Sequence, residues 1–175
     1  MKEEIFPIVD ETGKVTGSAT RAICHGGSRL LHPVVHIHVF SSRGEVFLQK
    51  RSETKDIQPG KWDTSVGGHV DFGETVADAA VRECREELGI DGATPELLYT
   101  YVWESERERE LVYVHRLVYD GPFRIDPVEL ADGRFWSEQE IAEQDGDEFT
   151  PNFLYDYSRL KAFLVEKSTH LIDAE

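Results

Sequence analysis

Three glutamates near the middle of the 175-residue chain, Glu83, Glu86 and Glu87, have a spacing that could serve metal chemistry. Positions three and four apart lie on the same side of an α-helix, so a helix here would gather all three carboxylates on one small surface. Carboxylate oxygens are the ligands that hard cations such as Mg²⁺ prefer. Acidic stretches on helices are more often solvated faces, and the spacing alone leaves both interpretations open.

A helix over residues 76–88 is predicted to position these glutamates. Thr75 and Asp78 are placed as a capping box at its start, and Gly89 as a stop at its end. The apolar residues that recur at helical spacing are Ala77, Val81, Cys84 and Leu88. They predict a buried face on the side opposite the glutamates.

The N-terminal half of the chain is predicted to form two β-hairpins. Residues 5–9 are an apolar run that ends at an Asp-Glu-Thr-Gly turn, and Val15 begins an extended partner. Residues 34–40 alternate apolar residues with histidines, and a Ser-Ser-Arg-Gly turn separates them from a second strand over 45–51.

The C-terminal half is predicted to contain further strands followed by two helices. The strands are expected at 96–102, 111–119 and 135–136. The first closing helix starts after Ser137, with Glu140 as its capping partner. The second starts at Thr150 and Pro151 and runs to Leu164 along an apolar stripe.

The composition favours one globular domain over residues 1–175. Apolar residues make up 39% of the chain, which is enough for a normal core. With 34 acidic and 19 basic residues, the formal charge of −15 would repel nucleic-acid polymers and anionic membranes. Neither partner is expected, whereas a small phosphorylated substrate is compatible with this charge if divalent cations are bound.

The cysteines and the N-terminus indicate a cytoplasmic protein. Cys24 and Cys84 lie far apart and form neither a zinc-knuckle nor a disulfide pattern. The N-terminus lacks the basic and apolar stretches of a secretory signal, and no apolar run reaches membrane-spanning length. The sequence leaves open whether the protein is a monomer or a homodimer.

The stretch from Gly68 to Ile90 resembles the signature of the Nudix hydrolase family at each of its fixed positions. Gly68 is followed after five residues by Glu74, and seven more residues separate Glu74 from the pair Arg82-Glu83. The positions that complete the signature are Cys84, Glu86, Glu87, Gly89 and Ile90. The cysteine is a soft departure, since the family more often has a branched aliphatic residue there, and we interpret it as a small buried hydrophobe.

The resemblance implies an α/β/α sandwich with a mixed sheet and a magnesium-dependent enzyme, with Mn²⁺ as the alternative ion. The family's metal ligands match Glu83, Glu86 and Glu87, and the backbone carbonyl of Gly67 is expected to complete the shell. Arg82 matches the residue that orients Glu83 by ion pairing, so the expected catalytic residues are Arg82, Glu83 and Glu86. Attack of water on a diphosphate adds charge to its oxygens, and hard cations stabilise such charge.

Outside the signature, residues 7–136 resemble the Nudix subgroup related to isopentenyl-diphosphate isomerase. The markers are weaker and include the stretch 59–62 and the pair Gly68-His69. In the isomerase, three histidines and two glutamates form a metal site. The matching residues are His25, His32, His69, Glu108 and Glu110. A second metal site is one interpretation of these residues, and histidines with structural hydrogen bonds are the other.

Three functions are compatible with this resemblance. Isomerisation needs an acid and a base on opposite sides of an alkene, and the isomerase cysteine that precedes Gly-His corresponds here to Gly67. A non-catalytic module that binds a nucleotide or a protein commonly lacks signature carboxylates that this chain retains. We therefore expect a hydrolase that cleaves a diphosphate bond in a nucleoside diphosphate linked to another group.

Substrate specificity must come from residues outside the signature. The basic residues that could contact phosphate are Lys50, Arg51, Lys55 and Lys61. The tryptophans that could stack on a base, although tryptophan is more often a core residue, are Trp62, Trp103 and Trp136. Glu129 lies in a connection where some family members have a base or an extra ligand. His36, His38 and His115 alternate within predicted strands and are assigned no role.

Overall fold

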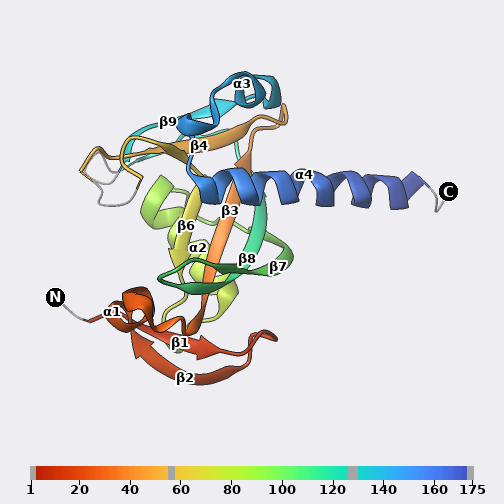
Figure 1. The fold of residues 1–175 in the computed structure, drawn as a ribbon. Coiled ribbons are helices and arrows are strands. Elements are labelled where there is room, and N and C mark those ends of the chain that lie inside the picture. The colour runs from red at the N-terminus through yellow and green to blue at the C-terminus, as the bar shows by residue number, and fades with distance from the viewer. Residues whose placement is uncertain (1–2, 55–57, 126–129, 173–175) are drawn as a thin grey trace.

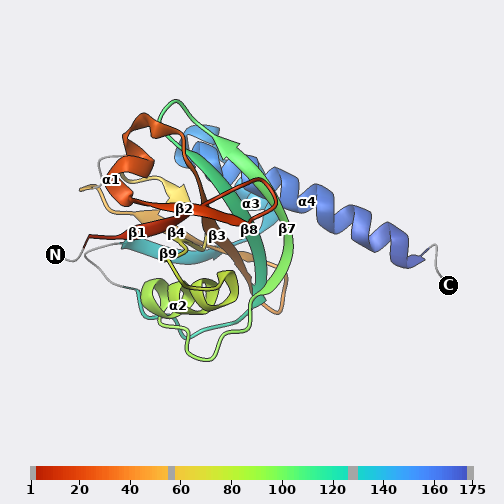
Figure 2. The same cartoon turned by 90° about the horizontal axis from the view of Figure 1, so that it is seen from below.

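A mixed β-sheet with helices on both faces forms the body of the protein (Figures 1 and 2). The computed structural model describes residues 3–54, 58–125 and 130–172, with side chains as far as residue 167. Within these ranges the main sheet has seven strands, and its central strand β3 (Leu31–Phe40) pairs in parallel with β8 (Arg109–Val118). The other pairings of β3 are antiparallel. The predicted α/β fold with a mixed sheet is confirmed.

Groups of consecutive strands are separated by helices along the chain. The other strands of the main sheet are β4 (Val46–Arg51), β5 (Trp62–Asp63), β6 (Val66–His69), β7 (Glu96–Glu104) and β9 (Leu130–Trp136). A separate antiparallel hairpin consists of β1 (Ile5–Val9) and β2 (Val15–Thr20). The helices are α1 (Arg21–Ile23), continued by a π-helical turn (Cys24–Ser28), α2 (Val76–Leu88), α3 (Glu138–Glu143), a 3₁₀ turn (Gly146–Glu148) and α4 (Pro151–Ile172).

The side chains of β3 alternate between the two faces of the sheet and so define two packed layers. Val35, Ile37 and Val39 pack against α2 in one cluster. Phe40 points to the other face and joins a second cluster with residues of α3 and α4. Figure 2 shows α2 on one side of the sheet and α4 on the other. Burial of both faces explains why β3 is an almost continuous apolar run.

β3 and β4 separate almost as soon as they pair. Among the described residues, their register contains the single pair Phe40–Val46. β6 then occupies the place beside β3, while β5 and β9 pair with β4. The predicted hairpin of residues 34–40 with 45–51 is therefore confirmed only at its closed end. The separation opens the sheet next to α2.

Helix α2 begins and ends where the sequence predicts. The Thr75 hydroxyl accepts the backbone N–H of Asp78 at 3.1 Å, and it donates to the Asp78 carboxylate at 2.6 Å. Gly89 ends the helix with a left-handed φ of 64°, a conformation that glycine adopts without a steric penalty. These local signals suffice to fix the helix.

The buried face of α2 differs from the prediction. Ala77 is exposed, and Val81 keeps 39% of its surface accessible. The buried residues are Ala79, Ala80, Cys84 and Leu88. Glu83 follows Ala79 by four positions and Glu87 follows Glu83 by four, so both glutamates border the buried face instead of lying opposite it. This rotation places two of the three carboxylates in partly buried positions.

Several other elements extend the predicted ranges. β3 begins at Leu31, earlier than predicted. The sequence pattern did not indicate this start, because Pro33 lacks the N–H that a strand residue normally donates. β9 begins at Leu130, earlier than predicted. The capping box at Ser137 and the start of α4 at Pro151 are confirmed. None of the helices in the described ranges combines the length and apolar character needed to cross a bilayer.

The docking of α4 on the sheet gives a test of the fold. Leu160 is fully buried in the α4 layer, whereas Leu154 on the same helix keeps 37% of its surface accessible. Leu160→Ala should lower the free energy of unfolding by about 2–5 kcal/mol, because it removes buried methyl groups and leaves a cavity. Leu154→Ala is the matched control and should cost about 1 kcal/mol or less. Urea unfolding followed by circular dichroism measures both, and equal losses would contradict this docking.

Candidate active site

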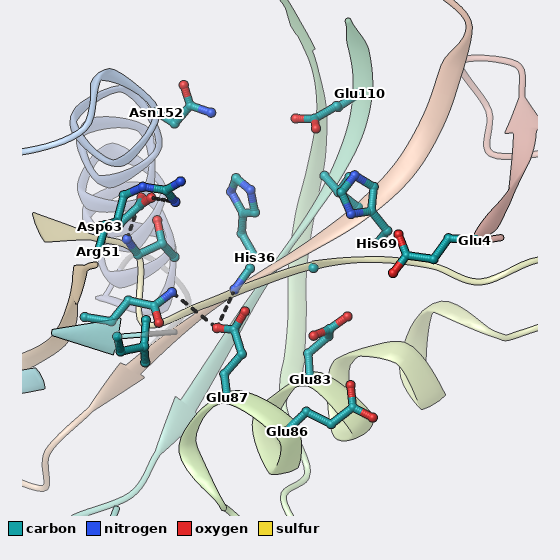
Figure 3. A pocket seen from close by; sticks show the side chains of 16 residues that line it. Glu4, His36, Arg51, Asp63, His69, Glu83, Glu86, Glu87, Glu110 and Asn152 are labelled. Atoms are coloured by element: carbon teal, nitrogen blue, oxygen red, sulfur yellow. Dashed lines mark hydrogen bonds and ion pairs between the residues drawn. The ribbon is translucent and has the colours of Figure 1, made fainter. Parts of the chain in front are cut away.

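A cavity of about 570 Å³ lies where β3 and β4 separate (Figure 3). Residues from both layers line it. Glu83, Glu86 and Glu87 reach it from α2, and His36 reaches it from the face of β3 that carries α4. Glu110, from the end of β8 next to the histidines described below, lines it as well. The separation of the strands thus lets side chains of opposite layers meet in one space.

Arg82 organises the acidic residues at the α2 end of the cavity. Its guanidinium donates to both oxygens of Glu74 at 2.9 Å, to Glu83 at 2.7 Å and to Glu86 at 3.1 Å. It also donates to the backbone carbonyl of His69 at 2.9 Å. The hydrogen bond to Glu74 and the neighbouring glutamates raise the pKa of Arg82, so the guanidinium stays protonated. A guanidinium with five donors suits this set of acceptors, which a lysine could not satisfy.

Glu87 and Glu83 are carboxylates held in a poorly solvated place. Glu87 accepts hydrogen bonds from the Gln49 amide at 3.2 Å and the backbone N–H of Gly67 at 3.4 Å. Burial, followed by repulsion from Glu83, raises the pKa of Glu87 to about 8. Burial also raises the pKa of Glu83, although Arg82 opposes the shift. Two such carboxylates side by side repel each other in their ionised forms. A divalent cation would balance their negative charge.

Gly68 makes room for the Glu83 carboxylate. A Cβ atom at position 68 would collide with the carboxylate carbon and both oxygens of Glu83. The backbone of β6 can therefore approach α2 only because residue 68 has no side chain. The neighbouring Gly67 pairs with His36 across β3 and β6, and its N–H faces Glu87.

The three histidines matched to the isomerase subgroup meet beside the cavity, which His69 lines. The ligand atoms of His25, His32 and His69 all lie within 4.8 Å of one another. Glu108 lies 3.3 Å from Nδ1 of His25, and Glu110 lies 4.0 Å from Nε2 of His32. The structure thus brings together all five residues of this set, from the π-helical turn, β3, β6 and the residues around the start of β8. We refer to them as the histidine cluster.

The protonation of the histidine cluster suits metal ligation. Burial lowers the pKa of His32 and holds that of His69 well below its usual range, so both rings are neutral at pH 7. Nδ1 of His32 lies 3.0 Å from the carbonyl of Leu30, which makes Nδ1 the donor and leaves Nε2 with its lone pair. This buried Nε2 has no hydrogen-bond partner among the described residues. A neutral imidazole fixed in this way is the usual state of a metal-binding histidine.

An aromatic wall closes the outer side of the histidine cluster. Phe6 of β1 stacks on the His69 ring with centroids 4.3 Å apart and on the His32 ring at 5.7 Å. Phe6 is itself buried. The hairpin of β1 and β2 therefore limits the access of water to the imidazoles.

Burial also raises the pKa of Glu110 to about 7.

The predicted phosphate-binding residues have different positions. Arg51 lines the cavity and pairs with Asp63 at 3.2 Å. Lys50 lies over the Trp62 ring, with Nζ 5.9 Å from its centroid. Lys61 precedes β5, and its backbone carbonyl accepts the N–H of Arg51. Arg51 is thus the basic residue of this set that the structure brings to the cavity. Lys55 and Glu129 lie outside the described residues.

The three tryptophans pack against other aromatic side chains. Trp62 and Trp136 are buried and meet edge to face, with centroids 5.1 Å apart. Trp103 packs on Tyr155 of α4 at 5.1 Å. None of the three is among the residues that line the described cavity. These contacts favour the core interpretation that the sequence also allowed.

Sequence reasoning missed the part that α4 plays in the cavity. Oδ2 of the buried Asp156 accepts hydrogen bonds from Nδ1 of His36 at 3.1 Å and Nε2 of His38 at 2.8 Å. Burial would raise the pKa of Asp156, but the two histidines hold it well below its usual range. Asn152, one turn before Asp156, also lines the cavity. No local pattern signals these contacts, because β3 and α4 are far apart in sequence.

Comparison with known proteins agrees with the signature helix and the sheet around it. A model of the NUDIX domain matches residues 30–157. The chain belongs to the Nudix family. An uncharacterised Nudix hydrolase of Yersinia pestis is 36% identical over 151 residues, which cover 86% of this chain and 82% of that protein. Another from Streptomyces coelicolor is 36% identical over 166 residues, which cover 92% and 90%. These relatives support a hydrolase of the Nudix family.

The isomerase subgroup appears among the relatives with partial coverage. An isopentenyl-diphosphate Delta-isomerase of Escherichia coli is 33% identical over 99 residues, which cover 57% of this Nudix chain and 54% of that enzyme. A crystal structure of a Deinococcus radiodurans protein matches with a TM-score of 0.67 and 26% identity, covering 79% and 86% of the two chains. The NUDIX domain of Shewanella oneidensis NrtR, solved with ADP ribose, matches with a TM-score of 0.61 and 16% identity, covering 75% and 87%. This last similarity concerns the fold alone.

Proposed function

We propose that this Nudix hydrolase cleaves the diphosphate bond of a nucleoside diphosphate linked to another group, with Mg²⁺ or Mn²⁺ as its cofactor. One observation carries the proposal: Glu83, Glu86 and Glu87 all line one cavity, and burial raises the pKa of two of them. Glu83 and Glu87 are poorly solvated, and clustered carboxylate oxygens of this kind are suited to a hard divalent ion. The backbone carbonyl of Gly67 is the further ligand that we assign to this site.

The residues around the glutamates have distinct tasks in this proposal. When bound, the ion supplies Lewis-acid polarisation of the phosphate and a water of lowered pKa. Arg82 fixes the carboxylates of Glu83 and Glu86, and Gln49 fixes Glu87, so that all three are held before substrate arrives. Arg51 at the β4 side is placed to bind a phosphate of the substrate.

Two other functions receive less support. Alkene isomerisation lacks the cysteine that the isomerase has just before Gly-His, since Gly67 occupies that position, and both Cys24 and Cys84 are fully buried. Burial raises the pKa of each thiol, which disfavours either as a reactive group. A non-catalytic binding module would have no need for the complete set of Arg82 and the α2 carboxylates.

We further propose that the histidine cluster binds a transition metal. The ligand atoms of three imidazoles lie within 4.8 Å of one another, and Glu108 and Glu110 lie near His25 and His32 respectively, a set that suits Zn²⁺ or Mn²⁺ better than Mg²⁺. The unpartnered Nε2 of His32 supports this assignment, because a buried polar atom without a partner destabilises the fold unless something binds it.

Glu83→Gln and Glu87→Gln should each keep the fold and reduce magnesium-dependent hydrolysis of ADP ribose by at least about a hundredfold, because each removes one charge from the metal site. Phosphate release after a phosphatase step measures turnover. Glu143→Gln, an exposed glutamate of α3, is the control and should retain wild-type activity. Near-normal turnover of Glu83→Gln with magnesium would show the metal assignment to be wrong.

Gly68→Ala should weaken Mn²⁺ binding about tenfold or more, since the new methyl group displaces the Glu83 carboxylate. Gly17→Ala is the matched control, because no atom lies within 4 Å of a Cβ built at that position. Electron paramagnetic resonance of free Mn²⁺ measures the affinity of both variants. Equal affinities in the two variants would argue against a metal held by Glu83.

Purified protein should retain a tightly bound transition metal after dialysis against magnesium, and His69→Ala should lose it. His115→Gln, which changes a buried histidine outside the cluster, should keep the metal. Ligation requires neutral imidazole, and burial lowers the pKa of these histidines, so affinity should fall only as the pH decreases below about 6.5. Elemental analysis measures the content. Metal-free protein that also fails to take up Zn²⁺ would remove the second site and leave the α2 site untouched.

A further inference from the structure

Strand β7 lies at one edge of the main sheet and leaves one side open for pairing. Among the described strands it pairs with β8 alone. Its inner residues, Leu97 to Trp103, include neither a charged residue nor a proline, two of the devices with which proteins protect an edge strand. Thr100, at the middle of β7, is exposed. This edge is therefore a place where another extended chain can add to the sheet.

Helix α4 runs along the same strand in the opposite direction. Tyr155 packs on Trp103, with ring centroids 5.1 Å apart, and Phe163 packs on Tyr99 at 4.9 Å. Residue numbers thus rise along the helix while they fall along the strand. Figures 1 and 2 both show the C-terminal part of α4 extending beyond the sheet. The helix and the open edge of β7 therefore face the same region outside the molecule.

A groove of about 350 Å³ lies between β7 and α4. Tyr99 and Thr100 line it from the strand. The residues that line it from the helix are Arg159, Ala162, Phe163 and Glu166. Arg159 and Glu166 are two helical turns apart and so lie on the same side of α4, with the small, exposed Ala162 between them.

The groove is complementary to a second copy of itself. A two-fold axis through the edge at Thr100 makes two β7 strands antiparallel, with each Thr100 opposite the other and Tyr99 opposite Tyr101. The guanidinium of Arg159 lies over the Tyr101 ring at 4.9 Å, and Phe163 packs on Tyr99, so the middle of this helix segment lies over Thr100. The same axis therefore brings two α4 helices together in antiparallel orientation.

The charges of the groove support this partner. In the antiparallel helix pair, Arg159 faces Glu166 of the second copy, and the contact occurs twice because a two-fold interface is isologous. Among the described residues neither side chain has an ion-pair partner of its own, whereas the neighbouring Lys167 pairs with Glu96 at 3.4 Å. The groove is thus locally balanced in a chain of charge −15, and salt screens the repulsion between more distant charges beyond about 8–10 Å.

We propose that the groove between β7 and α4 is the interface of a two-fold homodimer of this chain. The register of β7 against β8 shifts between Leu97 and Tyr99, so the shared ladder about Thr100 is short and the α4 helices supply much of the contact. The candidate active site lies between β3 and β4, and β8 separates β3 from this edge. The proposal therefore stands apart from the hydrolase function.

Substitutions at the axis test the interface. Light scattering should give the wild-type protein twice the chain mass of 19.9 kDa. Thr100→Glu and Thr100→Lys should each be monomeric, because two like charges then lie directly opposite each other. An equal mixture of the two variants should regain the dimer mass, since opposite charges meet at the axis. Thr16→Glu, on the exposed strand β2, is the matched control and should stay dimeric.

A cross-link tests the same register without added charge. Directly opposite residues of antiparallel strands have Cα atoms about 4.5–5.5 Å apart, a distance that a disulfide can span. Thr100→Cys should therefore form a covalent dimer under mild oxidation, seen on a non-reducing gel, whereas Thr16→Cys should not. The native Cys24 and Cys84 are buried and should not contribute.

The helix contact is tested by Glu166→Arg, which turns both Arg159 contacts into repulsion and should raise the dimer dissociation constant about tenfold. Glu143→Arg, an exposed position on α3, is the control and should leave the constant unchanged. A monomeric wild-type protein would overturn the proposal, even if an added peptide occupied the groove. A dimer that persisted in Thr100→Glu, or a mixture with Thr100→Lys that stayed monomeric, would reject an interface with its axis at Thr100.

Discussion

The separation of β3 from β4 is the constraint on which the rest of the site depends. In a continuous sheet, the side chains of α2 and α4 would be confined to opposite layers. Here β6 pairs with β3 and β5 pairs with β4, so a gap remains between them after the pair Phe40–Val46. Glu87 enters this gap from one layer and His36 from the other. Gly68 of β6 leaves room for the Glu83 carboxylate of α2.

The electrostatics of the gap follow from that geometry. Glu87 and Glu110 are poorly solvated because they are buried. Burial raises the pKa of Glu87 to about 8 and that of Glu110 to about 7. A cation bound beside them would favour their ionised forms, as a nearby opposite charge always does. An acidic chain that binds an anionic substrate therefore needs its cations for binding as well as for chemistry. Arg82 does not meet this need, because its donors are occupied by glutamates and a backbone carbonyl.

Much of the fold could be predicted because its signals are local. The limits of α2 follow from Thr75 and Gly89, and the N-terminus of α3 follows from the capping box at Ser137. The buried face of α2 was less predictable, since Ala79 and Val81 are both apolar and only the position of the sheet decides which is covered. The opening of the sheet depends on how long β3 and β4 stay paired, which neither strand's own sequence specifies.

The residues of the site differ in the same way: some lie close together in the sequence, and others meet only in the folded chain. Glu83, Glu86 and Glu87 share a helix, so their proximity is a property of spacing. The histidine cluster comes from four separate segments, and resemblance to a subgroup brought its members together before the fold was known. The contact between His36 and Asp156 had neither a short spacing nor a family motif behind it. It arises because α4 crosses the sheet at the point where β3 turns a polar residue away from the α2 core.

The two ends of the cavity differ in chemistry, and this difference assigns them different roles. The α2 end offers carboxylates, and Glu86 there is 52% exposed, so solvent and substrate can reach it. The other end offers imidazoles behind the stacked ring of Phe6, where water has less access. Hard ions that exchange with substrate suit the first end, and a more tightly held transition metal suits the second. His36 reaches the same cavity from the α4 side of the sheet, so residues of both layers face the space between the two ends.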